Sequence, residues 1–458
     1  MLFGVAMSGF QVEGGYNSPG DGHPANNWQA WEQSGRVPAA GHALNFWEDY
    51  GPVLDRAVTA GCRTIRISVE WARCEPTPGG YDDEAFAHYG RILAACHARG
   101  LDPVVCLHHF THPAWLGPDF WLDLRSPDRF AAWAAEAASR LAPLNRHWLT
   151  INEINALAFQ TWFTGGLPPG RIGRTGDTVR AMGHLLAAHV LAYRAIKRLQ
   201  PGAVVATNNH AQSIYELDRL LLDVLLARGT GVGRHDLRDW LAARRDRYHA
   251  AVLPRPNAVE RAFRRCAASI VPLDQTVPRA VAAVYDHDES PRPLDVIQVN
   301  YYNPAASDRF RLPGRRTVGG RSWSPTRQIW DDAVDPDDLL RYLHANHEPG
   351  LELWVAENGL CTRVRDGVTY PRADGWDRVR YLKAVAGALE KAVADGLPLT
   401  RYYHWTLADN YEWGSYQHRF GLYRVDQAAG GPVWHDTDAF GGDAAAAYRR
   451  LASDLVAS

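Results

Sequence analysis

The sequence has few of the features that mark a redox, metal-binding or membrane protein. Its six cysteines are scattered and form no C-x-x-C pair, so we expect buried reduced thiols rather than a metal or redox site. No stretch reaches the roughly 18 apolar residues of a membrane span. The formal net charge of -2 gives no basic excess for nucleic acid or a membrane surface. The first seven residues lack the basic segment of a secretory leader and run directly into a strand-like pattern. These absences predict a soluble, cytoplasmic protein without nucleic-acid or membrane partners.

Apolar and aromatic residues, by contrast, are plentiful. Hydrophobic residues make up 46% of the 458 residues, which is enough for a sizeable core. The 17 Trp and 19 Tyr are an excess, and flat aromatic faces suit the C–H surfaces of sugars as well as they suit a core. We expect core packing for most of them.

Eight short apolar runs alternate with amphipathic helical patterns along nearly the whole chain. This alternation is typical of a parallel sheet with crossover helices, and eight strands predict an α/β fold with one closed (β/α)8 TIM barrel. The predicted strands are 3–9, 64–69, 103–109, 147–152, 203–209, 295–301, 352–356 and 401–407. We expect one domain over residues 1–458. Two segments, about 211–292 and 304–330, break the alternation and are predicted to be loop insertions at the C-terminal face of the strands.

Helix starts are also visible in the sequence. Ser126-Pro127 and Asp335-Pro336 each place a capping residue before a proline, the arrangement of an N-cap followed by the first helical position. We therefore expect helices to begin at both places.

Two of the predicted strands end on a glutamate next to an asparagine. Glu357 closes one apolar run and is followed by Asn358, and Glu153 follows Asn152 at the end of another. Most glutamates are simply solvated, but a charge at the end of a buried strand is costly unless it has a chemical role. Two carboxylates on separate strands are what hydrolysis of a glycosidic bond requires.

Other polar and aromatic residues lie at the same strand ends. In a barrel of parallel strands these ends gather on one face, where the chemistry is found. Amides, acids, one arginine and tryptophans suit the hydroxyls and ring faces of sugars. The residues are Gln11, Arg66, His109, Asn152, Asn300, Tyr302, Trp405, Glu412 and Trp413. His108, His109 and His112 do not have zinc-motif spacing, so no metal or cofactor is predicted.

Several of these segments resemble glycoside hydrolase family 1, the retaining β-glycosidases. Residues 150–154 (TINEI) are similar to the acid/base motif T-x-N-E-P, and residues 357–359 (ENG) to the nucleophile motif E-N-G. Residues 107–113 resemble L-Y-H-W-D-x-P, and residues 3–14, 66–73, 300–302 and 405–413 complete a resemblance that covers nearly the whole chain. Phe110, Thr111 and Ile154 depart from the Trp, Asp and Pro of these motifs.

The resemblance implies a role for each site residue. Glu357 would be the nucleophile and Glu153 the acid/base, roughly 5–5.5 Å apart, in a two-step hydrolysis through a covalent glycosyl-enzyme. Arg66 and Tyr302 would favour ionised Glu357, whereas the charge of Glu357 and a partly dehydrated site would raise the pKa of Glu153. Supporting and substrate-binding roles fall to the remaining residues: Asn152 and Asn300 near the reacting carbon, and Gln11, His109, Trp405, Glu412 and Trp413 around the sugar.

Three alternatives to a β-glucosidase-like, exo-acting hydrolase remain open. The same scaffold could transfer the glycosyl group to another alcohol or act on a specialised natural product. It could also act on a 6-phosphorylated sugar, although the carboxylate of Glu412 would repel a phosphate. A carbohydrate-binding protein without catalysis is opposed by the presence of both glutamates. The expected partner is a small β-glycoside, and no oligomeric state is predicted.

Overall fold

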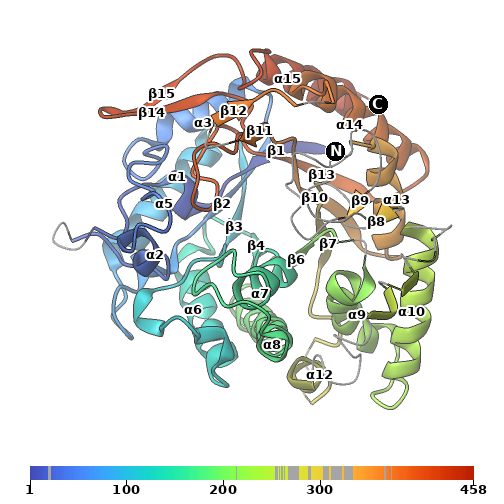
Figure 1. The fold of residues 1–458 in the computed structure, drawn as a ribbon. Helices are drawn as coiled ribbons and strands as arrows, with labels where there is room; N and C mark the ends of the chain where they lie inside the picture. The colour runs from blue at the N-terminus through green and yellow to red at the C-terminus, as the bar shows by residue number, and fades with distance from the viewer. Residues whose placement is uncertain are drawn as a thin grey trace.

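The computed structural model describes residues 1–18, 22–212, 214–252, 256, 258, 261, 262, 264–266, 278–286, 290–302, 309, 310, 322, 323, 334–365, 368–372 and 374–457 (Figure 1). Nine parallel strands form one sheet in the order β5-β4-β3-β2-β1-β13-β10-β7-β6. Their bounds are β1 (Leu2–Ala6), β2 (Thr64–Ser68), β3 (Asp102–Cys106), β4 (His147–Leu149), β5 (Val204–Ala206), β6 (Asn208–His210), β7 (Val296–Asn300), β10 (Glu352–Asn358) and β13 (Leu399–Trp405).

The predicted (β/α)8 barrel is confirmed, with one strand divided. Residues 203–209 were expected to form a single strand, but Thr207 separates β5 from β6. β5 pairs with β4 and β6 pairs with β7, so consecutive segments of the chain join the two ends of the sheet. The hydroxyl of Thr207 donates to the carbonyl of Ile151 at 2.8 Å, which holds the break against the neighbouring loop. The nine strands of this sheet are parallel, so their carboxyl ends lie on one side of the molecule.

An outer ring of helices covers the sheet (Figure 1). Strand residues such as Val5, Ile65, Val105 and Val355 are buried, which explains why the strands are continuous apolar runs rather than alternating ones. The helices are α1 (Gly9–Val12), α2 (Gln29–Gln33), α3 (Tyr50–Thr59), α4 (Trp71–Cys74), α5 (Asp83–Ala98), α6 (Ser126–Leu141), α7 (Ile154–Trp162), α8 (Thr175–Leu199), α9 (Arg219–Ala227), α10 (Leu237–Val252), α12 (Pro278–Tyr285), α13 (Pro336–Asn346), α14 (Arg378–Ala394) and α15 (Ala444–Ala457).

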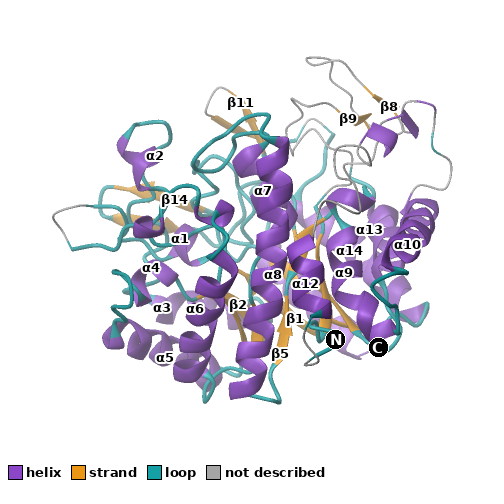
Figure 2. Cartoon of the chain, turned by 90° about the horizontal axis from the view of Figure 1, so that it is seen from below, coloured by secondary structure: helices purple, strands orange, loops and turns teal. Residues whose placement is uncertain are grey.

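Short 3-10 turns and strand pairs lie outside the nine-stranded sheet. They are the 3-10 turns η1 (Ala114–Leu116), η2 (Phe120–Leu122), η3 (Tyr215–Leu217) and η4 (Arg228–Thr230), and the strand pairs β8 (Arg309–Phe310) with β9 (Ser322–Trp323), β11 (Arg363–Arg365) with β12 (Val368–Tyr370), and β14 (Val425–Ala428) with β15 (Gly431–Trp434). In Figure 2 the N-terminus, where β1 begins, lies at the lower side and β11 at the opposite side, where the barrel strands end.

One of the two predicted helix starts is correct to the residue. Asp335 caps α13, since its side chain accepts from the backbone N–H of Asp337. At α6 the prediction is one residue late: the helix begins at Ser126, and Arg125 occupies the cap position. The Ser126 hydroxyl donates instead to the carbonyl of Asp123 at 2.8 Å, which stabilises the turn that leads into the helix.

The first predicted insertion contributes helices to the outer ring. Within it, α12 packs against α8, and α10 packs against both α9 and α13 (Figures 1 and 2). Its described helices therefore lie around the barrel wall rather than over the strand ends. Most of the second predicted insertion, 304–330, lies outside the described residues.

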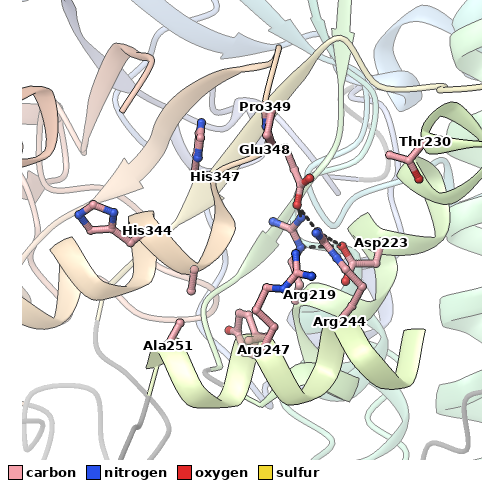
Figure 3. A pocket seen from close by; sticks show the side chains of 12 residues that line it. Arg219, Asp223, Thr230, Arg244, Arg247, Ala251, His344, His347, Glu348 and Pro349 are labelled. Atoms are coloured by element: carbon pink, nitrogen blue, oxygen red, sulfur yellow. Dashed lines mark hydrogen bonds and ion pairs between the residues drawn. The ribbon is translucent and has the colours of Figure 1, made fainter. Parts of the chain in front are cut away.

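A charged cluster fastens α9 and α10 to the segment that follows α13 (Figure 3). It borders a hollow of about 390 Å³. Arg219 and Arg244 both donate to Asp223, at 2.8 and 2.7 Å, and both contact Glu348. Burial would raise the pKa of Asp223, but the two guanidinium groups hold it below its usual value. Because two acids balance two arginines here, we assign this cluster a structural role.

No helix in the described ranges is long and apolar enough to cross a membrane. The six cysteines are not joined in disulfides; Cys266 is exposed, and the other five are buried as expected.

Candidate active site

Glu357 lies at the carboxyl end of β10 and is held by two partners. Arg66 of β2 forms an ion pair with Oε1, and the Tyr302 hydroxyl donates to Oε2 at 2.5 Å. Asn358 fixes the strand end, since its amide donates to the carbonyl of Tyr301 at 2.5 Å. Burial raises the pKa of Glu357 despite the opposing effects of Arg66 and Tyr302. The carboxylate is thus oriented through both oxygens.

Glu153 lies between β4 and α7 and is oriented through its backbone as well as its side chain. Its φ of 49° is uncommon for a residue with a side chain, and its N–H donates to Oδ1 of Asn208 at 2.7 Å. The amide of Asn300 donates to Oε1 at 2.8 Å, and Nδ1 of His210 lies 3.1 Å from the same oxygen. Both glutamates are buried, with 6% of Glu153 and 3% of Glu357 exposed.

The expected rise in the pKa of Glu153 is not found. Burial raises that pKa, as predicted. His210 and Asn300 lower it by more than burial raises it, so the pKa of Glu153 lies below its usual value. The sequence-based expectation is wrong on this point because it did not include His210. Burial lowers the pKa of His210, but the neighbouring carboxyl group of Glu153 raises it by more, so that it lies above its usual value.

Asn152 connects the surroundings of the two glutamates. Its Oδ1 accepts from Arg66 at 3.2 Å, from Asn208 at 3.1 Å and from Asn300 at 3.3 Å. Its amide nitrogen lies 3.2 Å from Nε2 of His109. Asn152 therefore links the arginine beside Glu357 to the asparagine beside Glu153.

Glu412 lies at the other side of this network. Its Oε2 accepts from Nε2 of Gln11 and from Nε1 of Trp405, both at 3.2 Å. The ring of His109 stacks on Trp405 and on Trp413, with centroids 5.6 Å apart in each pair. The structure thus brings all the site residues predicted from the sequence into one contiguous network at the strand ends.

Glu412 differs from the sequence-based expectation in its charge. Burial raises the pKa of Glu412 to about 8, although the hydrogen bond from Trp405 lowers it. At neutral pH the free protein therefore holds mainly the neutral acid at this position, rather than the carboxylate that we expected.

The three departures from the family motifs have local structural accounts. Ile154 is buried and is the first residue of α7, directly after Glu153. Phe110 packs between His109 and Trp413, with a centroid distance of 4.9 Å to Trp413. The Thr111 hydroxyl donates to the buried carboxyl group of Glu70 at 2.6 Å. None of the three removes a contact of the two catalytic candidates.

The sequence analysis missed His210, and it placed Asn208 at a strand end without giving it a role in the site. Asn208 bonds to the backbone of Glu153 and to the side chains of Asn152 and Asn300. The predicted strand stopped at Asn209, whereas β6 continues to His210. Polar residues at the last positions of a barrel strand were the signal, and extending this strand by one residue would have included His210.

No group of three or more His, Cys, Asp or Glu side chains in the described part of the chain is arranged to hold a metal ion.

Comparisons with known proteins agree on one family. The profile described as Glycosyl hydrolase family 1 matches residues 1–232 and 291–432. The 6-phospho-beta-galactosidase of Lacticaseibacillus casei is 26% identical, over 93% of this chain and 93% of the relative. The Beta-galactosidase of Saccharolobus solfataricus is 25% identical, over 99% of this chain and 94% of the relative.

Solved structures share the fold. The Beta-glucosidase from Thermotoga maritima superposes with a TM-score of 0.73 at 20% identity, over 99% of this chain and 97% of the other. The AHE enzyme from Alicyclobacillus herbarius gives a TM-score of 0.74 at 21% identity, over 100% and 98% of the two chains. With the family profile matching most of its length, the chain belongs to glycosyl hydrolase family 1, the retaining β-glycosidases that its motifs resemble.

Proposed function

We propose that Glu357 and Glu153 carry out the two steps of a retaining, exo-acting β-glycosidase whose sugar is an unphosphorylated hexose. The observation that carries this proposal is the different environment of the two acids. Glu357 is held through both oxygens by an arginine and a tyrosine, as a nucleophile requires. Glu153 has only Oε1 engaged by the described residues, which leaves Oε2 for proton transfer.

In the first step an oxygen of Glu357 attacks the anomeric carbon. Glu153, a carboxylate in the free protein, takes up a proton from solvent as the glycoside binds. The bond between that carbon and the glycosidic oxygen then breaks, and Glu153 gives this proton to the departing oxygen. Arg66 and Tyr302 orient the attacking carboxylate, and Asn152 is placed to bind the hydroxyl next to the reacting carbon. The product of this step is a covalent glycosyl-enzyme on Glu357.

In the second step a water molecule replaces the departed alcohol. Glu153, now a carboxylate, removes a proton from the water while the water oxygen bonds to the anomeric carbon, and Glu357 is released. Two displacements at one carbon restore the original anomeric configuration.

Sugar recognition is supported by buried polar atoms of the predicted substrate-binding residues. Oε1 of Gln11 and Nδ1 of His109 are two such atoms: both are buried and neither has a hydrogen-bond partner among the described residues. Buried polar atoms without partners are costly, so sugar hydroxyls that satisfy them contribute strongly to specificity.

We expect the first product of 4-nitrophenyl β-glucoside hydrolysis to be the β-anomer of glucose. Proton NMR distinguishes the anomers before mutarotation mixes them. An α-anomer as the first product would instead indicate the inverting mechanism. In that mechanism the two carboxyl groups are roughly 6.5–9.5 Å apart, rather than roughly 5–5.5 Å. A carbohydrate-binding protein would release no nitrophenol at all.

The preference for an unphosphorylated sugar should increase as the pH rises through about 8. Below that pH Glu412 is mainly neutral, and above it the carboxylate repels a 6-phosphate. We expect the ratio of kcat/KM for β-glucoside to that for 6-phospho-β-glucoside to exceed one in the wild type and to rise between pH 7 and pH 9. In Glu412→Gln the ratio should be smaller and independent of pH.

Taking the ratio of two substrates cancels the ionisation of the shared catalytic acids. A wild-type preference for the 6-phosphoglucoside would contradict the proposed sugar. Acceptor alcohols added to the same assay separate hydrolysis from glycosyl transfer, because a transferase would form new glycosides at the expense of free sugar.

We also propose a single domain over residues 1–458 and a cytoplasmic location. The five buried cysteines, Cys62, Cys74, Cys96, Cys106 and Cys361, support the latter, because a reducing compartment keeps thiols out of disulfides.

A further inference from the structure

His210 contacts both halves of the catalytic centre, yet the two-step reaction as described above assigns it no part. It is the last residue of β6, and its side chain is 22% exposed. Its ring stacks on Tyr302 with a centroid distance of 5.6 Å and an interplanar angle of 20°. Tyr302 in turn donates to Glu357, so a continuous series of contacts runs from Glu153 through His210 to the nucleophile.

The backbone of His210 is fixed to the helix that Glu153 begins. Asn155, in the first turn of α7, accepts from the N–H of His210 at 2.9 Å and donates to its carbonyl at 2.7 Å. Glu153 is the residue that precedes α7. The backbone positions that carry the imidazole and the carboxyl group are therefore held next to each other by these hydrogen bonds.

The hydrogen bonds at Glu153 distinguish its two oxygens. The amide orientation of Asn300 is set by Asn208, which donates to its Oδ1 at 2.9 Å, so the Asn300 nitrogen must point to Oε1 of Glu153. When Glu153 is a carboxylate, Nδ1–H of His210 is a second donor to the same oxygen. The acids that face His210 are Glu153, Glu357 and Asp218, and they favour a protonated ring, although burial opposes it.

We propose that His210 is a positioning residue for the acid/base. Its Nδ1–H holds Oε1 of Glu153, so that Oε2 alone exchanges the proton, and it stabilises the carboxylate that exists between the two steps. In the first step the proton leaves Oε2 for the glycosidic oxygen, and in the second it returns to Oε2 from water. His210 neither gains nor loses a proton in this cycle. The inference rests on the proposed role of Glu153.

Two substitutions separate the hydrogen bond from the ring. His210→Phe keeps a flat ring against Tyr302 but removes the donor, whereas His210→Asn keeps an N–H donor near the position of Nδ1 but removes the ring. His344→Phe is the matched control, because His344 is a half-exposed histidine on α13, outside the catalytic centre.

The test compares kcat/KM for two β-glucosides with different leaving groups. 2,4-Dinitrophenolate leaves without a proton, whereas phenol needs one. We expect kcat/KM of His210→Phe to fall roughly tenfold or more with the phenyl glucoside, which is less than the 10²–10⁴-fold fall expected when a general acid is lost. With the dinitrophenyl glucoside the fall in kcat/KM should be much smaller. His210→Asn should recover part of the phenyl glucoside activity, and His344→Phe should match the wild type.

Equal losses of His210→Phe on both substrates would overturn the proposal, because a structural disturbance does not depend on the leaving group. Unchanged activity on both would also overturn it. These failures are distinguishable from failure of the proposed function, in which Glu153→Ala itself would show no dependence on the leaving group.

Discussion

Glu357→Gln should abolish turnover of every β-glycoside, with kcat lowered by roughly 10⁴-fold or more, as expected when the nucleophile of a two-step reaction is lost. The amide has nearly the shape of the carboxyl group and can still contact Arg66 and Tyr302, so the site should keep its geometry. Because a nucleophile is needed whatever the leaving group, the loss should be equally large for dinitrophenyl and phenyl glucosides. The measurement is kcat for both substrates.

Glu70→Gln is a matched control for this experiment. Glu70 is also a buried glutamate at a strand end, and burial raises its pKa to about 8, so the neutral amide resembles its state at neutral pH. It bonds to Thr111 and to the backbone of Phe10 rather than to the residues around Glu357. The control should keep most of the wild-type rate. A Glu357→Gln enzyme with comparable activity would show that the nucleophile lies elsewhere.

Glu153→Ala should lose activity in proportion to the need of the leaving group for a proton. With phenyl β-glucoside we expect kcat/KM to fall roughly 10²–10⁴-fold, whereas with the dinitrophenyl glucoside it should change little. The second step should become slow on both substrates, because water lacks its general base. Azide needs no base, so it should restore kcat with the dinitrophenyl glucoside and form the β-glucosyl azide.

The Glu357 variant provides the contrast for the azide experiment. If azide restored the Glu357 variant with a β-product, or if the two variants responded alike to the leaving group, the roles assigned to the two glutamates would be wrong.

The sequence predicted the barrel well because parallel strands buried on both faces leave continuous apolar runs. It did not predict where strand pairing stops. His109 and Asn152 were placed inside strands, but β3 ends at Cys106 and β4 at Leu149. The segments that follow are buried like the strands, so burial and an apolar residue in each made them look like continuations of the strands. The break at Thr207 was also not predictable, since it depends on pairing with β4 on one side and β7 on the other.

The sequence predicted the residues of the candidate site but not the pKa shifts of its acids. Strand-end position and family motifs were sufficient to find Glu153 and Glu357. The pKa of Glu153 depends on His210, which lies 57 residues further along the chain and reaches Glu153 only because β6 closes the barrel next to α7. The pKa of Glu412 depends on how completely Trp405, Gln11 and their neighbours bury it, and that follows from packing rather than from any motif.

Trapping the glycosyl-enzyme is the most direct test of the central claim, that Glu357 bonds covalently to the sugar. A 2-deoxy-2-fluoro-β-glucoside with a dinitrophenyl leaving group slows both steps, but the good leaving group keeps the first step faster than the second, so the intermediate accumulates. Peptide mapping by mass spectrometry should find one fluoroglucosyl group, attached to Glu357. A label on another residue, or steady turnover with no label and an inverted product, would contradict the account.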